Sequence, residues 1–255
     1  MNQHFSMKDA VSEAEWDLRC QLAALYRLVA HYRMTDLIYT HISVRVPGPE
    51  HHFLINNYGR MFSEMRASDL VKIDLDGKPV DGDSREVNEA GFVIHSAIHA
   101  AREDLICVVH THTAAGIAVA SQKQGLLPIS QHALKFYGHM TYHDYEGIAV
   151  DVDERDRLVA DLGDKRAMIL RNHGLLVGGR TVAEAWDHIY MLERACQAQV
   201  AALSGGCELV LPPEEVCTYT AGIFDMAAPT PPRWYDMAWE ASLREIKIEE
   251  TDAYT

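Results

Sequence analysis

Three histidines of this chain stand in a pattern that can bind a metal ion. His110 and His112 form a His-x-His pair at the end of the apolar run 105–109, and His173 follows a second apolar run, 167–170. Side chains of a strand alternate between its two faces, so the pair projects both imidazoles to one side. Three protein ligands leave one coordination position open, as catalytic zinc sites do. The sequence therefore predicts metal-assisted chemistry at these three histidines.

Chance is the first alternative to this interpretation, because the chain has 14 histidines and a lone His-x-His pair is a weak sign. The context favours a ligand set, since each apolar run is typical of a buried strand that ends at its histidine, where the chain turns. A second pair, His95 and His99, has the helical spacing of metalloprotease ligands, but Ser96 stands where those enzymes have a glutamate. We interpret His95 and His99 as residues that pack within a helix.

The elements that must position the three histidines follow from the periodicity of apolar residues. Turn signals predict a hairpin of strands 42–46 and 53–55, and a second pair of strands at 70–74 and 79–80. Helices are predicted over the amphipathic stretches that begin at good caps or end at glycines. These helices are 12–32 with Ser12 as cap, 90–101, 116–122, and 182–203 with Thr181 as cap.

Length and charge limit the class of protein. The 255 residues, 48% of them apolar, can bury one sizeable core, so we expect one domain over 1–210 and a tail, 211–255, that packs on it or on a neighbouring subunit. The net charge of -14, with scattered basic residues, argues against nucleic acid as a partner. No signal peptide, 18-residue apolar run or paired cysteine motif is present, so we expect a cytoplasmic protein without a membrane partner.

Further segments of the chain resemble the class II aldolase and adducin-head family over residues 15–210. The segments 87–98, 125–131 and 142–145 look closer to the adducin head than to the sugar-phosphate aldolases. The resemblance implies an α/β fold, with a central, mainly antiparallel sheet in a three-layer α/β/α domain. It also implies homotetramers with the site near a subunit boundary, and a divalent ion, zinc first and manganese, cobalt or iron as alternatives, on His110, His112 and His173.

The chain departs from the aldolases of that family at their acid/base position. Their carboxylate on the helix before the His-x-His strand corresponds to Gly91 here, and Glu89 falls where they have a phosphate-binding serine. A carboxylate there would repel a phosphate ester in a poorly solvated cleft. We therefore expect a substrate without phosphate, and keep Glu89 as a candidate catalytic residue.

Other departures supply the remaining candidates. The family's phosphate-gripping run is Thr40-His41-Ile42-Ser43 here, and the next loop has Tyr58-Gly59, so His41, Tyr58 and Gly59 are candidate substrate-binding residues. The run 132–138 resembles that of ribulose-phosphate epimerases but has Leu134 in place of their aspartate, which argues against epimerase chemistry. His132 remains a candidate for proton transfer.

Taken with the resemblance, these residues favour a divalent-metal lyase acting on a small, non-phosphorylated carbonyl or hydroxy acid. The ion would stabilise the enolate formed in a retro-aldol cleavage or a decarboxylation. Two alternatives stay open: a non-catalytic, adducin-like assembly module, and a non-haem iron oxygenase with Glu89 as a ligand.

Overall fold

A seven-stranded sheet forms the middle layer of the computed structural model, which describes residues 7–80, 85–147 and 154–255, without the side chains of 89 and 90. The strand order is β3-β2-β1-β4-β7-β6-β5, and every neighbouring pair is antiparallel except β5 and β6. The strands are β1 (His41–Arg45), β2 (Phe53–Ile55), β3 (Val71–Ile73), β4 (Cys107–Thr111), β5 (Met140–His143), β6 (Ala167–Leu170) and β7 (Gly174–Gly179). This is the mainly antiparallel sheet that was expected.

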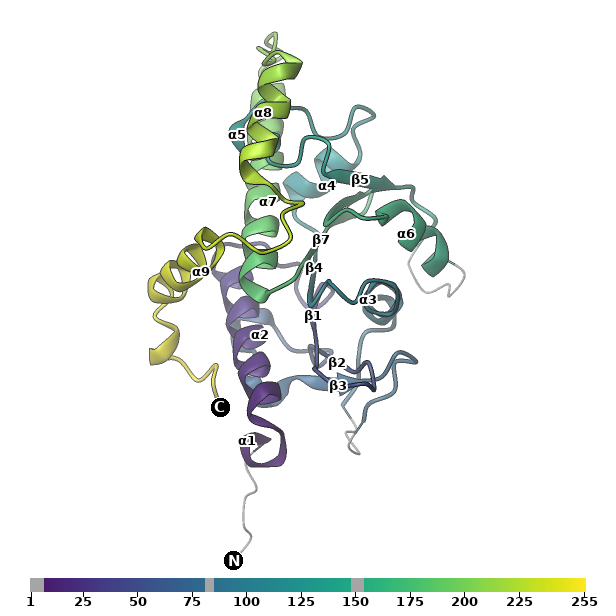
Figure 1. Cartoon of the computed structure of the whole chain (residues 1–255), viewed down its shortest axis with the longest axis vertical. Helices are drawn as coiled ribbons and strands as arrows, with labels where there is room; N and C mark the ends of the chain where they lie inside the picture. The colour runs from purple at the N-terminus through teal and green to yellow at the C-terminus, as the bar shows by residue number, and fades with distance from the viewer. Residues whose placement is uncertain (1–6, 81–84, 148–153) are drawn as a thin grey trace, which may run out of the picture.

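Helices cover both faces of the sheet, with α2 and α7 on one side and α3 and α6 on the other (Figure 1). The three layers therefore follow the expected α/β/α order. The helices are α1 (Met7–Ala10), α2 (Glu13–His31), α3 (Glu89–Ala101), α4 (Ala114–Ala120), α5 (Gln131–Leu134), α6 (Glu154–Leu162), α7 (Val182–Ser204), α8 (Glu214–Phe224) and α9 (Trp234–Glu245), with short 3-10 turns η1 (Phe62–Glu64), η2 (Ala67–Asp69) and η3 (Ile248–Glu250).

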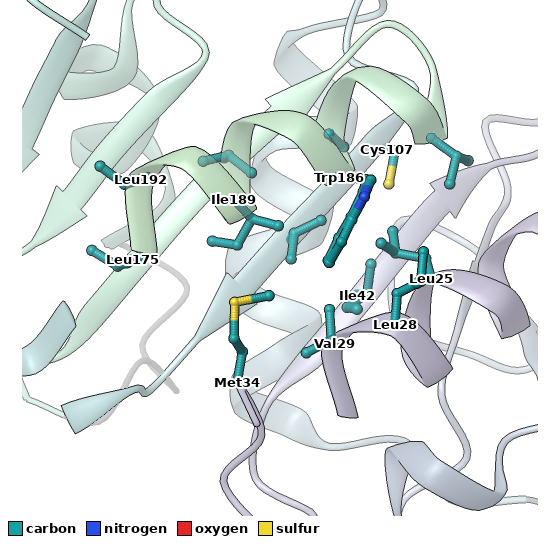
Figure 2. Close-up of a cluster of buried hydrophobic side chains, with 14 of the residues drawn as sticks. Leu25, Leu28, Val29, Met34, Ile42, Cys107, Leu175, Trp186, Ile189 and Leu192 are labelled. Carbon is teal, nitrogen blue, oxygen red and sulfur yellow. The ribbon is translucent and has the colours of Figure 1, made fainter. Parts of the chain in front are cut away.

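The larger core lies between the sheet and the layer of α2 and α7. Figure 2 shows Leu25, Leu28 and Val29 of α2 and Trp186 and Ile189 of α7 meeting over the strands. Strand alternation supplies the opposing side chains: residues 42 and 44 of β1 and 107 and 109 of β4 belong to this core. The alternate residues of both strands, among them His110, consequently face the opposite layer, which contains α3 and α6.

The local signals predicted the starts of α2 and α7 correctly, whereas the helix predicted over 116–122 is α4, which begins two residues earlier, at Ala114. Ser12 and Thr181 each accept a hydrogen bond at the side-chain oxygen from a backbone N–H of the first turn, at 3.2 Å and 3.0 Å. The hairpin of β1 and β2 forms as predicted. Of the second predicted pair, β3 is a strand and Ile73 makes a single antiparallel bridge to Pro79.

The strand that carries the His-x-His pair is shifted from its predicted bounds. β4 begins at Cys107 and runs through His110 to Thr111, so it does not end before the first histidine. Pairing explains the extension, because residues 107–111 are matched to β7 and 107–110 also to β1. A strand with partners on both sides satisfies its backbone groups along its whole length.

The C-terminal segment, predicted as a tail that packs on the domain or on a neighbouring subunit, contains the helices α8 and α9 and the 3-10 turn η3. α9 packs on α7 and α2, with Tyr235 buried, and α8 packs on α5. The division of the chain at residue 210 stays a prediction. Within the described ranges, no helix combines the length and the apolar character needed to cross a membrane.

Candidate metal centre

The three histidines come from the end of one strand and from one turn. His110 lies in β4, His112 stands one residue beyond its end, and His173 lies in the turn between β6 and β7. Because β7 pairs with β4, that turn comes to lie beside the His-x-His pair. The antiparallel pairing of two buried strands thus brings together histidines that are more than sixty residues apart in the sequence.

The turn that carries His173 depends on two backbone features. Asn172 adopts the left-handed conformation with φ of 56°, which asparagine tolerates better than most residues. Gly174 follows, and a Cβ added there would lie 2.3 Å from the carbonyl oxygen of Thr111. Only glycine lets the start of β7 approach β4 this closely, and that approach brings His173 to the pair.

The three side chains converge. One nitrogen of each histidine lies within 4.8 Å of the corresponding nitrogens of the other two. The ring centroid of His173 is 4.7 Å from that of His110 and 4.8 Å from that of His112. His110 is fully buried, whereas the other two are partly exposed, so the group is open on one side.

Hydrogen bonds fix the tautomers of two of these rings. Nδ1 of His110 lies 2.9 Å from the carbonyl oxygen of Leu175, and Nδ1 of His112 lies 3.1 Å from Oδ2 of Asp36. Both oxygens can only accept, so each Nδ1 carries the proton and donates it. Each Nε2 is therefore left with a lone pair. Partners of this kind are typical of histidines that ligate metals.

These two lone pairs face one another. Nε2 of His110 lies 2.7 Å from Nε2 of His112, and neither has a proton to share while both Nδ1 atoms donate. The repulsion between them is relieved when a cation binds to both nitrogens. A set of imidazole donors suits zinc and the other divalent ions of the first transition series. The residues present therefore fit a divalent ion.

Electrostatics keep the ligands in the form that binds metals. Burial is the main cause that lowers the pKa of His173 to about 4, and the neighbouring His112 adds to it. Burial is also the main cause that lowers the pKa of His110 well below its usual value, and His173 adds to it. Both imidazoles are consequently neutral at physiological pH, and a metal need not displace a proton from them.

His41 lies beside this group. It is paired across the strands with His110, and the two ring centroids are 5.1 Å apart. Tyr58 and Gly59 lie in a turn held by a hydrogen bond from the Tyr58 backbone N–H to the Glu86 carbonyl. Tyr58 borders a cavity of about 470 Å³ that it shares with residues 85–88 and with Gly77 and Pro79. The substrate-binding roles of His41, Tyr58 and Gly59 stay predictions.

The described part of the structure places neither of the two candidate catalytic side chains beside the three histidines. Glu89 opens α3, and its side chain lies outside the described part. His132 is in α5, which packs against α7 and α8, and no contact with the three histidines is found among the described residues. A role for either residue stays a prediction.

Sequence reasoning missed Asp36, which no spacing connects to His112. It also understated His95 and His99, which were interpreted as helix-packing residues. Both are fully buried, and they hydrogen-bond to His41 and Ser43 of β1. Their i, i+4 spacing together with the alternating polar residues 41, 43 and 45 was the available signal.

The comparisons with known proteins agree with this fold. The sequence profile described as "Class II Aldolase and Adducin N-terminal domain" matches residues 20–200. Alpha-adducin of Rattus norvegicus is 49% identical over 198 residues, which are 76% of this chain and 27% of that protein.

Two solved structures superpose on most of the chain. An aldolase II superfamily protein from Pseudomonas syringae is 53% identical, with a TM-score of 0.92, over 98% of this chain and 100% of that one. An L-fuculose 1-phosphate aldolase from Glaciozyma antarctica is 28% identical, with a TM-score of 0.81, over 100% of this chain and 96% of that one. A sugar-phosphate aldolase and an adducin thus stand among its relatives.

Proposed function

Since this chain belongs to the class II aldolase and adducin N-terminal domain family, we propose that it is a divalent-metal-dependent lyase. Its substrate is a small carbonyl or hydroxy acid without phosphate, and the reaction breaks a C–C bond by retro-aldol cleavage or decarboxylation. One observation carries the proposal: Nε2 of His110 and Nε2 of His112 meet at 2.7 Å while each Nδ1 is engaged by an acceptor. That arrangement is suited to binding a cation.

The chain's own residues hold the site in the ligating state. The Leu175 carbonyl and the Asp36 carboxylate orient two rings, and the turn at Asn172 presents the third. A divalent ion bound there would supply a Lewis acid, which would stabilise the negative charge that develops when the C–C bond breaks. Zinc is the ion we expect first, with manganese, cobalt and iron as alternatives.

The choice of a non-phosphorylated substrate rests on residues 89 and 91. Gly91 has no carboxylate for acid/base work, and Glu89 brings negative charge to the place where related aldolases bind phosphate. Decarboxylation needs less proton abstraction than aldol chemistry, so a site without that carboxylate is compatible with it. The L-fuculose 1-phosphate aldolase relative acts on a phosphorylated sugar, and we do not extend that substrate to this chain.

A non-catalytic assembly role is the second candidate, and the 49% identity to alpha-adducin favours it. In that case the histidines would persist without turnover. The iron oxygenase alternative names Glu89 as a ligand, and the side chain of that residue lies outside the described part, so no observation favours this alternative. We therefore do not develop it.

Assembly as a homotetramer completes the proposal. α8 exposes Val216, Tyr219 and Ile223 along one face, with 44%, 72% and 57% of their surfaces accessible. Apolar residues at this spacing form a stripe that association would remove from water. Light scattering on the purified protein measures the number of chains per particle.

The first test is metal content by elemental mass spectrometry. We expect about one ion per chain in the wild type and in His31→Ala, an exposed control histidine, and almost none in His110→Ala or His112→Ala. The metal-loaded protein is then incubated with panels of hydroxy and oxo acids and of their phosphate esters. An aldehyde product indicates retro-aldol cleavage, and carbon dioxide indicates decarboxylation. Stoichiometric metal without any cleavage would favour the assembly module, and metal retained by His110→Ala would refute the ligand assignment.

A further inference from the structure

A short helix, α4, contacts both segments that carry the metal ligands. Its cap residue, Thr113, directly follows His112 in the chain. At the other end of α4, the backbone N–H of Asn172, in the turn that carries His173, donates to the carbonyl of Ala120 at 3.4 Å. α4 therefore links the end of β4 to the turn between β6 and β7, and its position bears on the separation of the two ligands.

Side chains add to the contact between α4 and this turn. The guanidinium of Arg171 donates to the carbonyl of Gln122 at 2.9 Å. The side-chain amide of Asn172 donates to the hydroxyl of Ser121 at 3.4 Å. Residues 171 and 172 come directly before His173, so the residues at the end of α4 support the backbone that presents this ligand.

A buried carboxylate holds the other end of α4. The side-chain oxygen of Thr113 accepts from the backbone N–H of Gly116 at 3.1 Å, and its hydroxyl donates to Oε2 of Glu193 in α7. Thr113 is 7% exposed and Glu193 is 4% exposed. On the other side of His112, pairing with β7 fixes Thr111. The backbone of His112 is thus held from both sides, by the sheet and by α7.

Both oxygens of this carboxylate have partners. Oε1 of Glu193 accepts from Nε2 of Gln197 at 2.7 Å, and the side-chain carbonyl of Gln197 accepts in turn from Arg194 at 2.9 Å. A buried carboxylate with two such hydrogen bonds keeps one orientation, because turning it would leave polar atoms unpaired. Glu193 is therefore a fixed anchor for the cap of α4.

A buried amide holds the segment that follows α4. Gln199 of α7 is fully buried, and its Nε2 donates to Oε1 of Gln122 at 2.6 Å and to the carbonyl of Gly125 at 2.8 Å. Its Oε1 accepts from the backbone N–H of Leu127 at 2.7 Å. Since Gln122 also binds Arg171, α7 holds both ends of α4, which lies against it (Figure 1).

Packing alone does not account for Glu193 and Gln199. Between them, the buried positions of α7 are the apolar Ala195 and Cys196. Burying a polar side chain costs free energy that its hydrogen bonds offset, whereas an apolar residue packs without that cost. Hydrogen bonds are directional and apolar contacts are not. The two polar residues are therefore suited to fixing the exact position of α4.

We propose that Glu193 and Gln199 are positioning residues which, acting through α4, set the separation of His112 and His173. Neither residue touches the three ligands; each acts on the backbone beside one of them. This inference rests on the proposed function, because it concerns the same metal centre. It adds a second layer of support, next to Asp36 and the Leu175 carbonyl, which act on the rings themselves.

Zinc affinity, measured by competition with a chelator, tests the end of α4 beside His112. Thr113→Val keeps the shape of the side chain but loses the hydroxyl that Glu193 accepts, and we expect zinc to bind about tenfold more weakly. Thr113→Ser keeps the hydroxyl and should bind zinc as the wild type does. Thr181→Val makes the same change at the cap of α7, which follows the end of β7 remote from His173. This control should lose stability but not zinc affinity.

Two more variants test the partners in α7. Glu193→Leu should weaken zinc binding about as much as Thr113→Val does. Because these two side chains act through one contact, the double variant should lose little more than either single one. Gln199→Met removes the hydrogen bonds at the other end of α4 and should also weaken zinc binding.

The visible absorption of the cobalt-loaded protein reports on the arrangement of the ligands, which general destabilisation does not change. At saturating cobalt, Thr113→Val and Gln199→Met should have absorption bands shifted from those of the wild type. Thr113→Ser and Thr181→Val should match the wild type.

Wild-type zinc affinity and cobalt spectra in both Thr113→Val and Gln199→Met would overturn the positioning role. Equal losses of zinc affinity in Thr113→Val and Thr181→Val would also overturn it, since lower stability would then explain both. These two results leave the proposed function standing. A wild-type protein that binds no zinc would refute the proposed function together with this inference.

Discussion

Metal affinity can be tested most directly at Asp36. Its side chain supports His112 and can be replaced by mutation, whereas the corresponding partner of His110 is a backbone carbonyl. Replacing it changes the support of His112 without removing a ligand. Loss of a carboxylate behind a ligating histidine typically weakens metal binding by 10- to 100-fold. Here the Asp36 side chain is 44% exposed and lies 3.1 Å from His112, so solvent screens the interaction. We expect the lower end, about tenfold or about 1.4 kcal/mol, for Asp36→Asn.

The assay is competition for zinc with a chromophoric chelator. Asp36→Asn keeps an accepting oxygen but loses the charge, and Asp36→Ala loses both, so the second variant should bind zinc more weakly than the first. Asp17→Asn removes the same charge from the exposed side of α2 and should leave zinc affinity unchanged. Zinc affinity within about twofold of wild type in Asp36→Ala would refute the reasoning, since a supporting hydrogen bond is worth more than that.

Two further predictions concern stability. Burial, with a smaller effect of Lys135, lowers the pKa of His188 well below 6.5. As the pH drops, the unfolded state therefore binds a proton at this residue before the folded state does. The free energy of unfolding should fall below about pH 6.5, and His188 should contribute about 2 kcal/mol of that loss at about pH 5. Urea unfolding over this pH range should show a shallower loss for His188→Gln, and an identical pH slope would contradict the assignment. Gly91→Ala places a methyl group against the His41 ring and should cost about 1–3 kcal/mol in urea unfolding while zinc remains bound. Unchanged stability in that variant would mean that the contact between Gly91 and His41 is not tight.

Local patterns gave a large part of the secondary structure. The cap at Ser12, the cap at Thr181 and the apolar periodicity of α2 and α7 depend on residues within one or two turns of each other. Strand bounds were harder to predict, because the extension of β4 to Thr111 depends on partners that are distant in the chain. The sequence shows that residues 107–109 are apolar, but not that two strands flank them.

The residues of the candidate site likewise include some that local sequence patterns predict and others that only the folded protein shows. The spacing of His110 and His112 follows from the two-residue period of a strand, and the turn motif at His173 can be read directly from the sequence. Asp36 could not be found, since a carboxylate in a loop has no periodic relation to the histidine that it supports. The hydrogen bonds that join His95 and His99 to β1 were also out of reach, because β1 and α3 meet only in the folded protein.

By itself, the sequence determined the three histidines that converge, the helices α2 and α7 with their caps, and the absence of a carboxylate at Gly91. These features are either composition or short-range periodicity, which the covalent chain and its local conformations fix. Only the tertiary structure decided that Asp36 and Leu175 assign the tautomers of two histidines, and that the ring of His41 lies between Gly91 and His95. Such properties depend on the direction of hydrogen bonds between distant segments, and that direction is set only when the segments are packed together and water is excluded.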